Sequence, residues 1–118
     1  MKLKLIVHKI HNILVIKLKG IVTFKSCSNL QKSINQLIKD KKYIVIDVSE
    51  VEFHSEILSV VTLIVNKLNK IDGKLLFYSG NNKNADEVMK MISLDKVVYQ
   101  AFDMYTLHKW CEELSKDE

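Results

Sequence analysis

Three of the four histidines are residues that could carry chemistry, because imidazole nitrogens bind metals and transfer protons. His8 and His11 lie where two apolar segments meet, and His54 follows the segment that contains Asp47. Imidazoles together with a carboxylate could hold a zinc ion. Their spacings match no known set of metal ligands, so we predict no metal and no other cofactor.

Three carboxylates, those of Asp47, Glu50 and Glu52, lie close together in the sequence. A carboxylate acts in general acid–base catalysis when a nucleophile or a second base lies beside it. No motif places such a group here, and the chain's three glycines form no phosphate-binding loop. We therefore predict that the protein is not an enzyme, and that Asp47 bonds backbone N–H groups of a nearby loop.

The two cysteines, Cys27 and Cys111, are far apart and have no ligand spacing near them. Each falls on the apolar stripe of a predicted helix. We expect both to be small buried hydrophobic residues, as free cysteines commonly are.

The net charge of +4 comes from 18 lysines, and the chain has no arginine. Readers of nucleic acid rely on arginine for two-pronged contacts, and these lysines form no stripe interleaved with aromatic residues. The apolar runs are too short to span a membrane, and the start lacks the apolar core of a signal peptide. We expect a cytoplasmic location, with neither nucleic acid nor membrane as a partner.

The elements begin with two alternating segments, Leu3–Val7 and Ile13–Lys19, which His11-Asn12 would join as a hairpin. A helix follows, and Ser26 or Ser28 is expected to cap it. The segment Tyr43–Val48 is apolar on both faces, which is typical of a central parallel strand.

Later segments alternate between helix and strand. Apolar residues from Glu56 to about Ile71 predict a mostly buried helix that Asp72-Gly73 ends. The other expected elements are a strand at Lys74–Tyr78, a helix around Ala85–Ile92, a strand at Val97–Tyr99 and a last helix that Asp103 caps. We predict one α/β domain over residues 1–118, frayed at 115–118. It has a mixed, mostly parallel sheet of about five strands with four helices, in the order β-β-α-β-α-β-α-β-α.

This order and four sets of residues at its joints resemble the STAS domain family (sulfate transporter and anti-sigma factor antagonist) over most of the chain. Gly20 stands where the family has a glycine after its second strand. The other three matches are Asp47–Phe53, Asp72–Leu75 and Ser93–Val97. The resemblance implies a stand-alone bacterial signalling protein that binds an anti-sigma factor, a serine kinase-like protein or another signalling protein, and so acts in transcription regulation.

In stand-alone members, the loop after the phenylalanine carries a serine that the cognate anti-sigma-factor kinase phosphorylates. Aligned from Phe53, this chain has Glu56 for the loop's first serine and Ile57 for the acceptor serine. Thr23 stands where the family often has an aspartate. The resemblance to the fold therefore holds, whereas the usual acceptor hydroxyl is missing.

Two nearby residues leave alternatives open. Ser55 is either a shifted phosphosite or the N-cap of the second helix. Glu56 either imitates a phosphorylated loop or is simply a favourable acid in a first helical turn.

We predict that a protein partner binds at Thr23, before the first helix, together with the loop 54–59 and the start of the second helix. The contact residues of that second segment are His54, Ser55, Glu56, Ile57 and Ser59. Two other functions stay open. One is a scaffold or regulatory subunit of a signalling complex that is not phosphorylated. The other is a module that binds a nucleotide or another small molecule.

Overall fold

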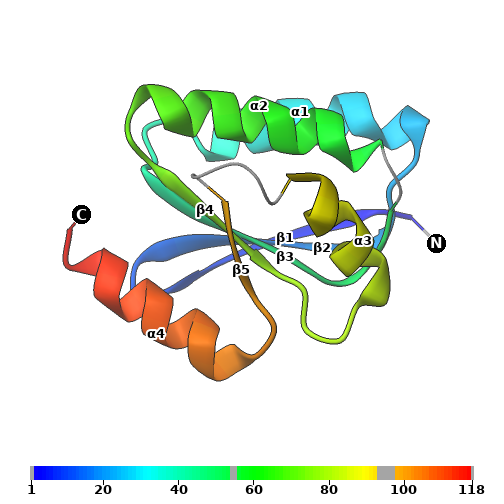
Figure 1. The fold of residues 1–118 in the computed structure, drawn as a ribbon. Helices are drawn as coiled ribbons and strands as arrows, with labels where there is room; N and C mark the ends of the chain where they lie inside the picture. The colour runs from blue at the N-terminus through cyan, green and yellow to red at the C-terminus, as the bar shows by residue number, and fades with distance from the viewer. Residues whose placement is uncertain (1, 54–55, 93–97, 118) are drawn as a thin grey trace.

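In the computed structural model, which describes residues 2–53, 56–92 and 98–117, five strands form a single sheet in the order β1-β2-β3-β4-β5 (Figure 1). The strands are β1 (Lys4–Ile10), β2 (Ile13–Ile21), β3 (Tyr43–Glu52), β4 (Lys74–Tyr78) and β5 (Val98–Ala101). The helices are α1 (Phe24–Leu37), α2 (Ile57–Lys70), α3 (Lys83–Ile92) and α4 (Met104–Ser115). Only β1 runs antiparallel to its neighbour among these strands. The predicted fold class and order of elements are confirmed.

The hairpin turn between β1 and β2 is the tight turn expected from His11-Asn12. Ile10 pairs with Ile13, so the turn has two residues, and their φ angles are 49° and 71°. Positive φ at both central positions matches the right-handed twist of the paired strands. Asparagine tolerates this conformation better than most residues, which explains its place here.

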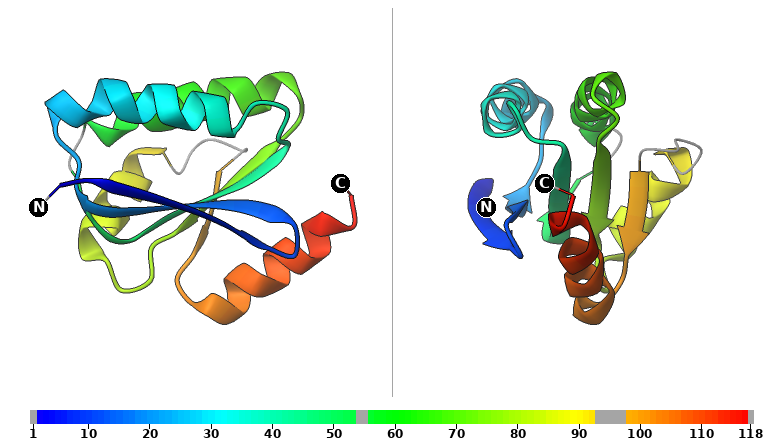
Figure 2. Two further views of the ribbon diagram at one scale, coloured as in Figure 1. Left: turned by 180° about the vertical axis from the view of Figure 1, so that it is seen from behind. Right: turned by 90° about the vertical axis from the view of Figure 1, so that its left-hand side faces the viewer.

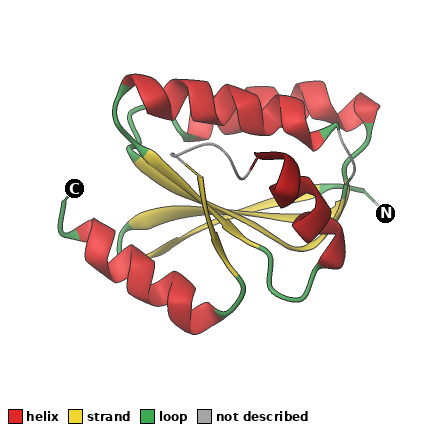
Figure 3. Cartoon of the chain, in the orientation of Figure 1, coloured by secondary structure: helices red, strands yellow, loops and turns green. Residues whose placement is uncertain are grey.

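Helices cover both faces of the sheet. In the two views of Figure 2, α1 and α2 lie side by side on one face, and α4 lies on the other. Figure 3 shows the same arrangement, with the yellow strands between the red helical layers. The larger core lies under α1 and α2 and includes Ile16, Ile46 and Phe77, whereas Val15 and Val45 face α4. Alternate residues of the central strands therefore enter different cores, which is why those strands are apolar on both faces.

The predicted cap of α1 is wrong. The helix begins at Phe24, and Thr23 is its N-cap, whereas Ser26 is the third helical residue and Ser28 lies inside the helix. Asp103 does cap α4, since its carboxylate accepts a hydrogen bond of 2.8 Å from the backbone N–H of Thr106. Both cysteines are buried on helical stripes, as predicted.

α2 is the most deeply buried of the described helices. Its buried side chains are Ile57, Val60, Val61, Ile64, Val65 and Leu68. It is nevertheless too short to cross a membrane, and no other described helix is both long and apolar enough to do so. The apolar stripe belongs to the larger core of the domain.

Candidate protein-binding site

The first turns of α1 and α2 lie next to each other at the carboxyl ends of β2 and β3 (Figure 1). Two contacts tie them together. The Cys27 thiol donates to the carbonyl oxygen of Glu56 at 3.5 Å, and one turn further on Gln31 Nε2 donates to Ser59 Oγ at 2.9 Å. The two helices therefore run parallel, with the positive ends of both dipoles at the same edge of the molecule.

A capping box fixes the start of α1. The backbone N–H of Thr23 donates to Ser26 Oγ at 2.8 Å, and the backbone N–H of Ser26 donates to Thr23 Oγ1 at 3.3 Å. These reciprocal bonds satisfy two backbone donors that a helix leaves unpaired at its start. The exposed residues beside this cap are thus held on a rigid element.

The start of α2 is built differently. Glu56 occupies the N-cap position, but its side chain makes no capping hydrogen bond. Its backbone carbonyl oxygen instead accepts from Ser59 Oγ at 2.9 Å, in addition to the Cys27 thiol. Burial, and secondarily the Glu56 charge, raises the pKa of Cys27, so this thiol is protonated at neutral pH. Glu56 thus contributes to the start of α2 through its backbone carbonyl oxygen, whereas its carboxylate makes no capping bond.

The most exposed large apolar side chain of this edge is Phe24, with 84% of its surface accessible. With Cys27, Glu56 and Ser59 it lines a surface hollow of about 250 Å³. A phenyl ring so open to water is unusual in a core-forming helix, and aromatic side chains are enriched in the centres of protein interfaces. Phe24 is not among the contact residues predicted from the sequence, although its place directly after Thr23, off the apolar stripe of α1, was a signal for it.

The structure brings together three of the predicted contact residues. The half-buried Glu56 and the exposed Ser59 line the hollow with Phe24, and the exposed Thr23 directly precedes Phe24 in the chain. Ile57, in contrast, is 1% exposed and packs in the larger core, so its side chain does not reach this surface. His54 and Ser55 lie outside the described residues, and with them both alternatives for Ser55 and the predicted contact at His54.

A family model of the STAS domain matches residues 4–110, which is most of the chain. The protein belongs to the STAS domain family. No curated protein matches its sequence at a significant level.

Three solved structures show how closely this STAS domain follows the family fold. An anti-sigma factor antagonist from Mycobacterium paratuberculosis superposes with a TM-score of 0.78 at 18% identity, over 93% of this chain and 94% of that one. The unphosphorylated form of the antagonist SpoIIAA gives 0.69 at 14% identity, over 92% and 96%. The phosphorylated form of SpoIIAA, a cell fate determinant of Bacillus, gives 0.66 at 14% identity, over 92% and 99%. At these identities the likeness establishes a shared fold.

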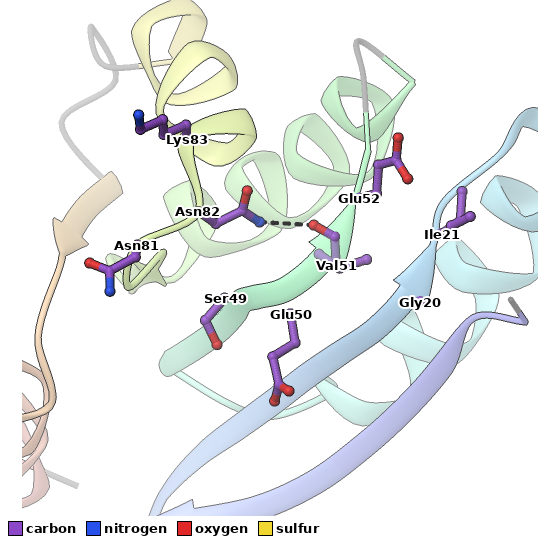
Figure 4. Close-up of a pocket in the computed structure, with 9 residues that line it drawn as sticks. All are labelled: Gly20, Ile21, Ser49, Glu50, Val51, Glu52, Asn81, Asn82 and Lys83. Carbon is purple, nitrogen blue, oxygen red and sulfur yellow. Dashed lines mark hydrogen bonds between the residues drawn. The ribbon is translucent and has the colours of Figure 1, made fainter.

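A second, larger hollow of the STAS domain, about 520 Å³, lies between the ends of β2 and β3 and the loop that leads into α3 (Figure 4). It is lined by Gly20, Ile21, Ser49, Glu50, Val51, Glu52, Asn81, Asn82 and Lys83. The hydrogen bond and the positive charge of Lys17, and then the charge of Lys19, lower the pKa of Glu50. Glu50 is therefore ionised at neutral pH and unsuited to donate a proton.

Asp47 bonds a backbone N–H group, as expected, but that group belongs to β3 itself and not to a nearby loop. Its Oδ1 accepts hydrogen bonds from the backbone N–H of Ser49 at 2.9 Å and from Ser49 Oγ at 2.7 Å. It thus stabilises the irregular end of β3. Among the described residues no three His, Cys, Asp or Glu side chains gather to hold a metal ion.

Another exposed apolar cluster lies on the opposite side of this STAS domain, at the start of α4. It consists of Phe102, Met104 and Tyr105, which are 54%, 47% and 75% exposed. Lys109 Nζ lies 6.0 Å from the centre of the Tyr105 ring. This cluster and the Phe24 hollow are on opposite faces of the sheet, so a single flat partner surface would not contact both.

Proposed function

We propose that this STAS domain acts by binding a protein partner in bacterial signalling, and that it is not an enzyme. The partner class we infer is an anti-sigma factor or serine kinase-like protein, in the cytoplasm, with an effect on transcription. Two of the similar structures are of anti-sigma factor antagonists, which supports this class of partner. We infer that the contact surface is formed by Thr23, Phe24, Glu56 and Ser59.

The observation that carries the proposal is the exposed Phe24 beside two joined helix starts. A partner that buries this ring would gain about 2 kcal/mol or more from removing its apolar surface from water. The half-buried Glu56 carboxylate and the exposed Ser59 beside it offer polar contacts at the rim, which is the usual composition of an interface. The hydrogen bonds that join α1 to α2 would keep this surface in one conformation in the free protein, and such preorganisation lowers the entropic cost of binding.

Regulation is the point at which this chain would depart from its relatives. SpoIIAA occurs in a phosphorylated and an unphosphorylated form. In this chain the residue aligned with the family's acceptor serine is Ile57, a buried side chain with no hydroxyl. We propose binding without phosphorylation at that position, which favours a constitutive scaffold or regulatory subunit over a phosphoserine switch.

The test is co-purification from the native cell with the tagged chain, followed by calorimetric titration of the captured partner. Phe24→Ala is expected to weaken binding roughly tenfold or more, as truncation of an aromatic anchor commonly does. Tyr105→Ala is the matched control, because it removes another largely exposed aromatic ring, 75% accessible against 84% for Phe24, from the opposite face. Equal affinity of Phe24→Ala and the unaltered chain would contradict the proposed surface.

The regulatory part has its own test. The chain is incubated with ATP and the serine kinase homologues encoded in the same genome, and labelled residues are mapped by mass spectrometry. We expect binding without labelling. A labelled Ser55 would instead support a shifted phosphosite and an anti-sigma factor antagonist under phosphorylation control.

A second candidate function, favoured by the 520 Å³ hollow, is binding of a nucleotide or another small polar molecule. Glu50, Glu52 and Lys83 supply charges of both signs there. A ligand that binds only the folded chain raises its melting temperature. A thermal-shift screen with nucleotides is therefore the discriminating measurement, and no shift at millimolar concentration would dismiss this candidate.

A further inference from the structure

The end of β3 extends beyond its neighbour on one side. Pairing with β4 stops where Asp47 faces Tyr78, although β3 continues to Glu52. On its other side β3 remains paired with β2 as far as Ile21, and the backbone N–H of Val22 then donates to the Glu52 carbonyl at 2.9 Å. Without a strand on the β4 side, the last backbone groups of β3 would be left unpaired in a partly buried place, which is costly.

Two asparagine side chains fill the place of the missing strand. Asn82 Nδ2 donates to the carbonyl oxygens of Val48 at 2.6 Å and of Val51 at 2.8 Å, the second of which is drawn in Figure 4. Asn84 Oδ1 accepts from the backbone N–H of Phe53 at 2.8 Å. Because carbonyls only accept and an amide N–H only donates, these partners also determine which way each side chain is oriented.

The two asparagines act as one unit. Asn82 Oδ1 accepts from the backbone N–H of Asn84 at 3.1 Å, so the side chain that holds β3 also satisfies a donor at the start of α3. The unit joins α3 to the end of β3 through three backbone groups of β3 and Phe53. The sequence pattern of neither segment indicates this link, because the partners are some 30 positions apart in the chain.

The link acts immediately before the proposed contact surface. Phe53 is fully buried, and the chain passes from it to Glu56, whose carbonyl receives the bonds from Cys27 and Ser59. We propose that Asn82 and Asn84 are positioning residues: they fix the point at which the chain leaves β3 and so hold the start of α2 beside α1. Their effect on partner binding rests on the proposed function, whereas their effect on the backbone does not.

The experiment uses two substitutions whose chemistry gives opposite expectations at the two positions. Asn84→Asp keeps the oxygen that Phe53 needs, and a carboxylate is favourable in the first turn of α3. Asn82→Asp keeps an oxygen that can accept from the backbone N–H of Asn84 at the start of α3. It loses the amide N–H donors to Val48 and Val51, and it places a negative carboxylate against their two carbonyl oxygens. We expect Asn84→Asp to behave like the unaltered chain and Asn82→Asp to behave like Asn84→Ala.

Amide hydrogen exchange followed by NMR supplies a readout that needs no partner. In Asn84→Ala the exchange of the Phe53 amide is expected to rise roughly tenfold, and that of the first-turn amides Ser59 and Val60 to rise with it. The amides of Ile16 and Ile44 in the centre of the sheet are expected to keep their rates. Should Asn84→Ala fail to fold, Asn84→Gln keeps the amide but displaces its oxygen, and carries the same expectation.

Affinity for the captured partner is the second readout. We expect a loss of roughly fivefold or more for Asn84→Ala and Asn82→Asp, and none for Asn84→Asp. Unchanged exchange at Ser59 and Val60 in all variants would overturn the positioning role. If exchange changes as expected but neither Asn84→Ala nor Phe24→Ala affects binding, the positioning stands and the proposed contact surface fails. If Phe24→Ala abolishes binding while Asn84→Ala changes neither readout, the proposed contact surface stands and the positioning role fails.

Discussion

Ser59 Oγ accepts a hydrogen bond of 2.9 Å from Gln31 Nε2 while it donates one of 2.9 Å to the Glu56 carbonyl. One hydroxyl thus joins α1 to the first turn of α2. We predict that Ser59→Ala and Gln31→Ala are coupled, with an interaction energy of about 0.5–1 kcal/mol in the free energy of unfolding. Urea unfolding of the two single variants and the double variant measures it, and the change in helix propensity at each position cancels in the cycle.

The control for this cycle is Ser33, another serine of α1. Ser33→Ala combined with Ser59→Ala is expected to be additive within about 0.3–0.5 kcal/mol. Additivity of the Gln31 and Ser59 changes as well would mean that the two helices are not joined through this hydroxyl.

The order of elements could be predicted from the sequence because each strand and helix carries its own pattern. Strands that enter two cores are apolar on both faces, as Tyr43–Val48 is, and the buried residues of α2, from Ile57 to Leu68, recur every three or four positions along one face of the helix. The turn at His11-Asn12 and the cap at Asp103 were also visible, since their chemistry is local.

The residues at which helices and strands start and end were harder to predict from the sequence, for a physical reason. Serine and threonine cap helices almost equally well, so the choice between Thr23 and Ser26 depends on where the chain leaves β2. The true end of β3 depends on Asn82 and Asn84, which belong to a distant loop and helix. Contacts between segments far apart in sequence leave no periodic signal, and the site is built largely from such contacts.

Glu56 provides a prediction about partner affinity. Its carboxylate lies at the start of α2 without a capping bond, where it adds negative charge to the proposed contact surface. If this charge imitates a phosphorylated loop, Glu56→Ser will change the dissociation constant of the captured partner by roughly threefold or more, in a salt-dependent way. Calorimetric titration at low and high ionic strength is the measurement.

Glu87, an exposed acid in α3, supplies the matched control for that charge. Glu87→Ser removes the same charge from another place and is expected to leave affinity within about twofold. Equal affinity of Glu56→Ser and the unaltered chain would leave Glu56 as an ordinary acid at the N-cap of α2, just before the first turn in which the sequence placed it.

Cys111 predicts how stability depends on alkaline pH. Cys111 lies on the buried face of α4, and this burial raises the pKa of its thiol from 9.0 to about 11. The thiol of the unfolded chain ionises first as the pH rises, so the unfolded state is favoured progressively between those two values. The stabilising contribution is therefore fully present below pH 9 and is lost as the pH approaches about 11.

The measurement is the urea midpoint of the unaltered chain and of Cys111→Ala from pH 8 to pH 11. The raised pKa values of Lys17 and Tyr78 also make the free energy of unfolding fall as the pH rises, and they do so in both proteins. The difference between the two curves therefore isolates the effect of the thiol. We expect the difference to narrow as pH rises. Parallel curves would show that Cys111 does not titrate differently in the folded chain. The native thiol is also expected to react slowly with a thiol reagent at neutral pH.

Gly20 gives the strongest prediction for stability. Its φ of +114° lies in a region that side-chain-bearing residues rarely adopt. A Cβ there would press against the carbonyl oxygen of Lys2 and lie 3.1 Å from the Cα of Leu3, and both are backbone atoms that cannot turn aside. Gly20→Ala is therefore expected to lower the free energy of unfolding by about 2–4 kcal/mol, from strain and displacement of the start of β1 together.

A substitution at Gly80 serves to separate backbone strain from displacement of a neighbouring segment. Its φ of +54° is a left-handed conformation that other residues can reach, and the nearest atom to an added Cβ is Ser49 Cβ at 3.2 Å. Gly80→Ala is accordingly expected to cost only about 1 kcal/mol. Because Gly20 pairs with Val51 at the end of β3, relief of the clash by a shift of β2 would also move the strand end that Asn82 and Asn84 hold. Faster exchange of the Phe53 amide in Gly20→Ala but not in Gly80→Ala would reveal that shift, and equal unfolding energies of the two variants would contradict it.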